Sequence, residues 1–391
     1  MRTVDVEERR ARLALRHRLA PVARVATPVE AAAALVGLHA TDPASVYLSA
    51  LARVDGFDVP AMERALYDER SLLKILGMRR TMFVVPRDLA AVVHASCTVA
   101  IAARERRRDI AMLESAGIAD AARWLADAEA ATVAALTRRG EAVATELTKD
   151  VPALALQIPV GQGKKWQGTI GMSTRVLFLL SMEGRIVRAR PRGSWISSQY
   201  RWTALDRWVP GGLEPWDVEA ARAELVRRWL AAYGPATVRD VEWWTGWTLG
   251  ETRKAIAALG TVEVDLDGMP GLLLGDDVEP TPTPEPWLAF LPALDPTVMG
   301  WAARDWYLGP HRAALFDTNG NAGPTIWWSG RVVGGWAQRA DGRIAWRLLE
   351  DVGSDAEGAA ELAAAKLEAW IGGVRITPRF RTPLEKELST A

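Results

Sequence analysis

An imidazole, a hydroxyl and a carboxylate stand close together at His39, Thr41 and Asp42, just before Pro43. Proline disfavours helical torsions in the residue before it, so the chain is expected to leave the preceding helix by Asp42. If residues 39–41 are extended, side chains two apart point to the same side, and His39 and Thr41 face one cavity. If the helix continues, they point about 200° apart. The structural alternative is that both satisfy backbone groups at a helix end.

The helix before this motif has a recognisable start. Thr27 is placed as its N-cap, Pro28 as its first residue and Glu30 as the partner in a capping box. The apolar pattern runs through Leu35, and Gly37 weakens it. The chain is therefore expected to leave the helix between residues 37 and 42.

A second group of chemically informative residues is basic. Between residues 162 and 208 the sequence has nine Lys and Arg residues but only two acidic ones, within a chain of zero formal net charge. Arginines alternate there with tryptophans, and Trp195 at the hairpin tip is a candidate wedge for a DNA groove. A solvated strand face with a core tryptophan is the structural alternative. The candidate DNA-binding residues are Arg79, Arg80, Lys164, Lys165, Arg188, Arg190, Arg192, Trp195 and Arg201.

The elements that must position these residues are clearest in residues 218–275. Capping-box spacing at Thr237/Asp240 and Thr248/Glu251 predicts two helices after a first one, and a hairpin is expected to turn at Asp267-Gly268. Three helices followed by a hairpin are typical of a winged helix-turn-helix. The segments 141–202 and 28–86 repeat the order less clearly.

The expected fold is therefore mainly α with β, built as three tandem winged-helix units plus a C-terminal β-barrel-like domain. Proline- and glycine-rich breaks at residues 209–217 and 276–286 separate the later parts. We expect a first unit in 1–130 with the candidate catalytic motif, a second with the basic hairpin in 131–210, a third in 211–280, and the barrel-like domain in 281–391. Three tandem units favour a monomer that wraps one duplex.

Composition excludes several classes of protein. Cys97 is the only cysteine, which rules out a disulfide within the chain and a cysteine-based zinc site. We find no dinucleotide fingerprint and no cluster with metal-ligand spacing, so no cofactor and no metal are expected. The chain lacks a secretion signal and an apolar run long enough to span a membrane, so we expect a soluble, cytoplasmic protein without membrane partners. Asp295, before Pro296, is expected to start a turn.

Five segments together resemble the AlkZ/YcaQ family of bacterial DNA glycosylases, in the order found there. They are "LVGLHATDPASVYLSALARV", "SLLKILGMRRTMFVV", "GPATVRDVEWWTGWTLGETRKAIAAL", "FLPALDPTVMGWAARDWYL" and "PTIWWSGRVVGGW". The resemblance implies three winged helices and a β-barrel around a DNA-binding concavity. It also implies removal of N-alkylated purines, including bulky adducts and crosslinks made by alkylating antibiotics.

The family's catalytic motif is usually Gln-x-Gln or Gln-x-Asp, where this chain has His39-Ala40-Thr41. Three alternatives follow. His39 replaces the first glutamine as base or orienting group with Thr41 as a second hydrogen-bonding partner, Asp42 is the working carboxylate, or the site is inactive. The candidate catalytic residues are thus His39, Thr41 and Asp42.

The chemistry favours the first alternative. An N7-alkylated guanine is positively charged and already a good leaving group, so the enzyme needs only to hold a water and stabilise oxocarbenium-like charge. A histidine near its ordinary pKa accepts the water's proton. The leading hypothesis is a metal-free, monofunctional glycosylase acting on alkylated purines in double-stranded DNA. The alternatives are a winged-helix transcription regulator and a non-catalytic damage-binding protein.

Overall fold

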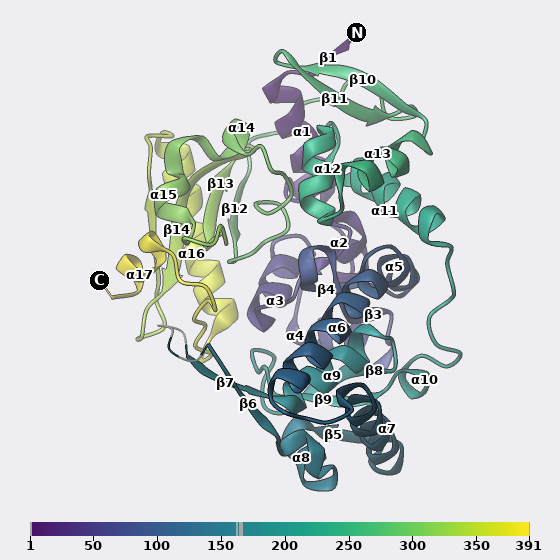
Figure 1. The fold of residues 1–391 in the computed structure, drawn as a ribbon. Coiled ribbons are helices and arrows are strands. Elements are labelled where there is room, and N and C mark those ends of the chain that lie inside the picture. The colour runs from purple at the N-terminus through teal and green to yellow at the C-terminus, as the bar shows by residue number, and fades with distance from the viewer. Residues whose placement is uncertain (1, 162, 164–166, 391) are drawn as a thin grey trace.

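The computed structural model describes residues 2–161, 163 and 167–390. Within them, the strands form four sheets of three or four strands and one separate hairpin, surrounded by helices. Figure 1 shows residues 28–115 in the middle of the molecule, with residues 121–208 below and the C-terminal part to the left. Residues 218–274 lie above, together with the N-terminal residues 2–16. Helix and strand are mixed throughout, so the fold is of mixed α and β type.

The first sheet has the order β2-β4-β3 and holds the candidate catalytic motif. In β2, His39 pairs with Phe83 of β4. The elements of this part are α1 (Val6–Arg16), α2 (Pro28–Ala34), β2 (Leu38–His39), α3 (Pro43–Leu51), α4 (Val59–Glu63), β3 (Leu72–Gly77), β4 (Thr81–Pro86), α5 (Arg87–Val93) and α6 (Val99–Ser115).

The helix before the motif begins as predicted and ends earlier than predicted. Thr27 and Glu30 form the capping box, which confirms the helix start. The helix ends at Ala34, and Gly37 has φ +118°. A Cβ at residue 37 would lie 2.8 Å from Val85 Cγ1, so only glycine lets the chain pass this close to β4. Residues 38–39 are therefore strand, not helix.

The second sheet has the order β5-β9-β8. The segment between helices α8 and α9 contains an extra hairpin in which Pro159 pairs with Thr169. The elements are α7 (Ala121–Arg139), β5 (Glu141–Val143), α8 (Ala144–Asp150), β6 (Gln157–Val160), β7 (Gly168–Gly171), α9 (Met172–Met182), β8 (Ile186–Pro191), β9 (Tyr200–Ala204) and α10 (Leu205–Trp208).

The third sheet has the order β1-β10-β11 and agrees closely with the sequence. Both predicted capping boxes are present, and the hairpin turns at Asp267-Gly268 with positive φ at both residues. The N-terminal strand β1 (Arg2–Thr3) adds to its edge in parallel with β10. The other elements are α11 (Val218–Tyr233), α12 (Val238–Thr245), α13 (Leu249–Ala257), β10 (Thr261–Leu266) and β11 (Met269–Leu274).

The three sheets share one connectivity. In the first two, a short strand precedes two helices and then pairs with the second strand of the hairpin that follows them. In the third, the single residue Ala236 takes that place by bridging to Leu272 of β11. The same chain path thus occurs three times within the described residues.

The C-terminal sheet is open, so the prediction of a β-barrel is wrong. Its strands follow the order β12-β13-β14-β15, all antiparallel, and within the described residues β12 and β15 do not pair. Four strands are too few to close around side chains, and helices cover the sheet instead. At Gly335 a Cβ would lie 2.8 Å from Leu384 Cδ2 of α17. The elements are β12 (Leu288–Leu291), α14 (Asp305–Leu308), α15 (Arg312–Leu315), β13 (Thr325–Trp328), β14 (Arg331–Gln338), β15 (Ile344–Leu348), α16 (Ser354–Ile371) and α17 (Pro383–Thr390).

Candidate active site and nucleic-acid interface

Thr41 opens onto a cavity of about 490 Å³ between the first and second sheets, which we call the Thr41 cavity. The Thr41 side chain is partly exposed, and its hydroxyl makes no hydrogen bond within the described residues. It is therefore free to hold a water or a ligand atom. The cavity is lined by Ala40, Thr41, Pro43, Val143, Ala144, Thr145, Arg188, Arg192, Ser198, Gln199, Tyr200, Trp202 and Arg379.

One wall of the Thr41 cavity is a stack of cations and aromatic rings. The Arg188 guanidinium lies 5.2 Å from the ring centroids of both Tyr200 and Trp202. On Tyr200, the Lys74 ammonium lies 4.2 Å from the ring centroid and donates to the hydroxyl at 3.0 Å. Cation–π contacts hold Arg188 in place without using its N–H donors. Its Nε is buried without a partner among the described residues.

The Thr41 cavity is positively charged. Its described lining contains three arginines and no carboxylate. Arg192 pairs with Glu146 of α8, whereas Arg379 is exposed at the rim. A site with this charge suits anionic groups, which in DNA are the backbone phosphates.

His39 does not share the cavity with Thr41. Its side chain is buried, with 6 % exposure, and its ring centroid lies 5.4 Å from that of Phe83. Burial, reinforced by the positive charge of Arg79, lowers the pKa of His39 to about 3. The imidazole is therefore neutral and weakly basic at pH 7, which argues against the expected general base with an ordinary pKa. Nδ1 has no hydrogen-bond partner within the described residues.

Asp42 caps α3. Its Oδ1 accepts from the Ala44 backbone N–H at 3.1 Å, and its Oδ2 accepts from the Arg379 backbone N–H at 3.0 Å. Burial raises the pKa of the Asp42 carboxyl, and these two backbone donors oppose the rise. Both oxygens are thus engaged in fixing the start of α3 and the C-terminal segment beside Thr41.

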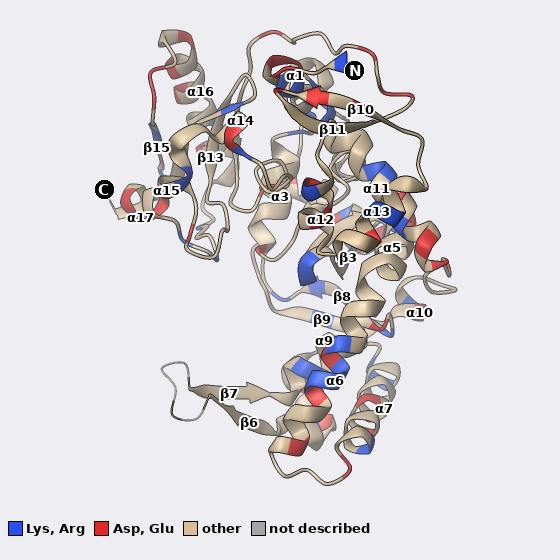
Figure 2. Cartoon of the chain, turned by 45° about the horizontal axis from the view of Figure 1, so that its top comes forward, with Lys and Arg blue, Asp and Glu red and all other residues tan. Residues whose placement is uncertain are grey.

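Several predicted DNA-binding residues lie in ion pairs. Arg190 pairs with Glu63 and Asp68, and Arg80 pairs with Glu105. Arg175 of α9 pairs with Glu105 and Asp109 of α6, and Figure 2 shows basic and acidic positions next to one another in this region. Because carboxylates pack against its arginines, the basic segment 162–208 carries less net positive charge in the folded structure than its sequence indicates.

The remaining predicted residues are placed as follows. Trp195 is 8 % exposed and packs against Tyr47 and Trp370 at centroid distances of 5.1 and 5.6 Å, so the ring is not presented as the expected wedge. Arg201 is partly buried on β9, opposite Val143. Arg79 lines a different cavity. Lys164 and Lys165 lie outside the described residues.

A buried ion pair fixes the residues that directly follow α3 to the C-terminal part, and Ser49 of α3 donates to the same carboxylate. Arg53 and Asp295 are both fully buried and form a two-pronged pair at 2.7 and 2.9 Å. Arg53 also donates to the His17 carbonyl, the Ser49 carbonyl and the Thr297 hydroxyl. Asp295 therefore has a second role beyond the predicted start of a turn, because its ion pair with Arg53 joins two distant parts of the chain.

Buried neutral histidines predict a loss of stability in mild acid. Burial lowers the pKa of both His17 and His39 from 6.5 to about 3. Between these values the unfolded chain binds more protons, so stability falls as the pH drops below about 6.5, by about 1.4 kcal/mol per pH unit for each histidine. Urea unfolding between pH 7 and pH 5 measures this slope. His39→Gln should remove the part of the slope that one histidine contributes, and an unchanged slope would contradict neutral burial of His39.

Two residues that line the Thr41 cavity, and Lys74 behind one of them, were not identified from the sequence. Arg379 lies 337 positions from Asp42, which it contacts, and no motif surrounds it. Lys74 and Tyr200 sit in ordinary strand patterns, and only the fold brings them together. No local signal marks any of the three.

Comparisons with known proteins give a family and a similar fold. The family model described as "DNA glycosylase AlkZ-like" matches residues 32–370. The solved structure of Streptomyces sahachiroi DNA glycosylase AlkZ is similar in fold, with a TM-score of 0.72 and 20 % sequence identity over 96 % of this chain and 99 % of that chain. No curated protein matches the sequence significantly. In the described part of the chain, no helix is long and apolar enough to cross a membrane. Because the family model spans most of its length, the chain belongs to the AlkZ-like DNA glycosylase family.

Proposed function

We propose that this protein is a monofunctional DNA glycosylase that hydrolyses the N-glycosidic bond of N7-alkylguanine or related alkylpurines in double-stranded DNA, including bulky antibiotic adducts. One observation carries the proposal. At the position of the family's catalytic motif, the hydroxyl of Thr41, unpaired within the described residues, opens into a cavity lined with arginines. Family membership supports the reaction class.

In the proposed reaction, a water held at Thr41 attacks C1′ of the damaged nucleotide. The bond from C1′ to N9 breaks, and its electron pair stays with the base, cancelling the charge created by alkylation at N7. The proton that the water gives up passes to solvent. A neutral hydroxyl is sufficient because the cationic base needs no general acid, and positioning supplies most of the rate.

The arginines fit the DNA backbone better than the damaged base. Arg188 and Arg379 would repel a cationic alkylpurine but attract the phosphates on either side of it, whereas the charge of Arg192 is balanced by Glu146. The cavity volume of about 490 Å³ lies within the range of small-molecule pockets, which leaves room for a substituted purine. We therefore assign the base to the part near Thr41 and the phosphates to the arginine wall.

His39 and Asp42 are proposed as positioning residues. The neutral imidazole of His39, two residues before Thr41, packs against Phe83 and fixes the short strand β2. Asp42 fixes the turn into α3 through two backbone N–H groups. Neither group requires a pKa near 7 for this role.

The repeated connectivity of the three small sheets supports the proposal of three winged-helix units, expected in 1–130, 131–210 and 211–280 and followed by the C-terminal part from 281. The expected boundary at residue 130 falls inside α7 (Ala121–Arg139). A winged helix contains a short first strand that pairs with the last strand of its hairpin, as in the first two sheets, and in the third sheet the single residue Ala236 takes that place. Three units in one chain favour a monomer on one duplex.

The substrate is tested with two duplexes, one carrying N7-methylguanine and one a bulky N7 adduct of an alkylating antibiotic. We expect release of both bases, with strand breaks only after alkali, because no step requires a Schiff base. Rejection of the bulky duplex would limit the substrate to small lesions. Strand cleavage without alkali would contradict a monofunctional enzyme.

A further inference from the structure

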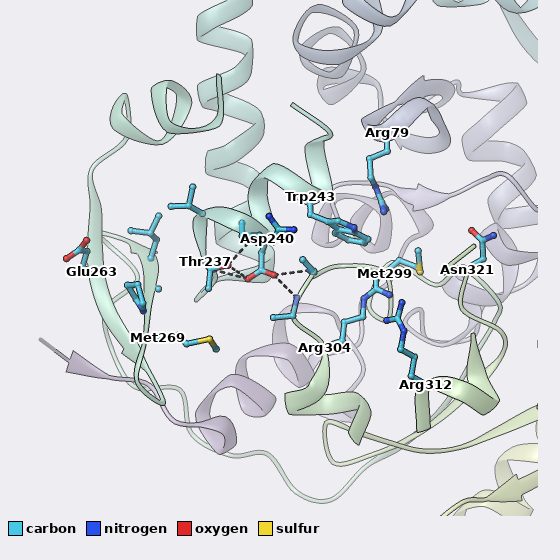
Figure 3. Close-up of a pocket in the computed structure, with 18 of the residues that line it drawn as sticks. Arg79, Thr237, Asp240, Trp243, Glu263, Met269, Met299, Arg304, Arg312 and Asn321 are labelled. Atoms are coloured by element: carbon cyan, nitrogen blue, oxygen red, sulfur yellow. Dashed lines mark hydrogen bonds between the residues drawn. The ribbon is translucent and has the colours of Figure 1, made fainter. Parts of the chain in front are cut away.

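A second and larger cavity, of about 900 Å³, lies between the third sheet and the C-terminal part. We call it the arginine cavity. Figure 3 shows that Arg79, Arg304 and Arg312 reach toward the same region near Trp243, although they come from distant parts of the chain. Arg239 also lines the cavity and is exposed, with 83 % of its side chain accessible.

The arginine cavity is built as a ladder of guanidinium groups and aromatic rings. The Arg79 and Arg304 guanidinium carbons lie 3.9 and 4.6 Å from the Trp243 ring centroid. The Arg304 and Arg312 carbons lie 5.2 and 5.1 Å from the Phe316 ring centroid. The rings fix all three cations without using their N–H donors.

Within the described residues none of these three arginines forms an ion pair, and the charge of Asp240 only partly opposes the lowering of the Arg304 pKa by burial. Asp240 lines the cavity, but one of its oxygens accepts from the backbone and hydroxyl of Thr237, and the other accepts from the Ala302 and Ala303 N–H groups. Figure 3 places Glu263 at the opposite end, away from Arg304. Three positive charges therefore converge on one side of the cavity.

Keeping these cations together is costly without an anion. Arg304 is 5 % exposed, and only its Nε has a hydrogen-bond acceptor in the described structure, the Trp301 carbonyl. Burial, together with the charge of Arg304, lowers the pKa of Arg79 to about 10, which leaves it charged at pH 7.

Arg79 also has φ +52°, in the left-handed region that residues with a long side chain seldom adopt. Strain of this kind concentrates at functional sites.

We propose that Arg79, Arg304 and Arg312 form a second anchor for DNA, binding backbone phosphates of the duplex whose damaged base lies at Thr41. This inference rests on the proposed function for its ligand. Guanidinium groups match phosphate oxygens in pairs, and the side chains of all three line one cavity. A duplex held at both cavities would contact the first and second sheets at the Thr41 cavity. It would contact the third sheet and the C-terminal part at the arginine cavity.

The test is the salt dependence of binding to undamaged duplex DNA, which requires no catalysis. The slope of log Kd against log salt concentration is expected to fall by about 0.9 for each phosphate that a variant no longer neutralises. We expect this change for Arg79→Gln and for Arg312→Gln, and a larger one for the double variant. Arg312 is exposed, so its variant should fold even if Arg79→Gln does not. The matched control is Arg123→Gln on α7, a charge with 79 % exposure outside both cavities.

The outcomes separate this inference from the proposed function. Unchanged slopes in folded variants, with base release intact, would overturn the second anchor alone. Reduced slopes with no base release in the wild type would support the anchor and overturn the glycosylase. A rise in Tm with inorganic phosphate that is abolished in Arg312→Gln, alongside unchanged DNA slopes, would assign the cavity to a small free anion and contradict the proposal.

Discussion

Thr41→Val is expected to lower the single-turnover rate of base release by about 10²–10³-fold, the usual effect of removing one hydrogen-bonding group that acts at the reacting atoms. Valine has the shape of threonine without the hydroxyl, so the cavity and α3 should keep their form. The hydroxyl has no partner within the described residues, and its removal leaves no buried group unpaired there. The effect should therefore appear in the rate and not in the Kd for damaged duplex.

Two variants make this result specific. Thr41→Ser keeps the hydroxyl and should retain most of the activity. Thr145→Val removes a hydroxyl that lines the same cavity from α8, and should leave the rate nearly unchanged. Full activity in Thr41→Val, or an equally slow Thr145→Val, would mean that Thr41 does not hold the attacking water.

Asp295→Asn is expected to destabilise the protein by about 3–5 kcal/mol, because it leaves the guanidinium of Arg53 buried without its counter-charge. Both side chains have no exposure, and every oxygen and N–H group of the pair has a partner. Urea unfolding at pH 7 measures the change. Because Thr41 lies near the start of α3, and the pair fixes the residues that directly follow α3 to the C-terminal part, the affinity for damaged duplex should fall as well.

The control for this prediction is an exposed pair. Asp127→Asn removes the partner of Arg123, where both side chains are more than three-quarters exposed, and should cost less than about 1 kcal/mol. Replacing Arg53 and Asp295 together by methionine and leucine should cost less than Asp295→Asn alone, since no charge remains buried. Equal costs for Asp295→Asn and Asp127→Asn would contradict the importance of the buried pair.

Local signals in the sequence were sufficient for much of the fold. The capping residues Thr237 and Thr248 and the turn at Asp267-Gly268 predict the third sheet and its helices, because each acts on backbone groups within a few residues. The C-terminal barrel could not be excluded in the same way. Closure depends on which strands pair at the edges, and strand composition does not encode it.

The charge of the interface was the least predictable property. A run of arginines in sequence indicates a basic surface only if no acidic residue folds against it. Arg190 meets Glu63, 127 positions away, and Arg175 meets Asp109, 66 positions away. The same long-range packing creates the arginine cavity, since Arg304 and Arg312 lack basic neighbours in a motif. The candidate DNA contacts are therefore the arginines without an ion-pair partner in the described structure, and not the arginines that are most closely spaced in the sequence.

The motif itself was only partly predictable. The sequence predicts that the helix ends between residues 37 and 42, and only if residues 39–41 are extended does the same-side rule place His39 and Thr41 together. The structure buries His39 near Phe83 and opens Thr41 to the second sheet, because the chain turns into α3 directly after residue 41. The rule that side chains two residues apart point to the same side applies only within a continuous strand, and β2 ends at His39.

The most direct test of the central claim is single-turnover release of free N7-methylguanine from duplex DNA by excess wild-type protein, with binding to the same duplex measured in parallel. We predict release well above the spontaneous rate, with one abasic site formed for each base set free. Tight, damage-dependent binding with release no faster than in buffer would contradict the claim and identify the protein as a non-catalytic damage binder.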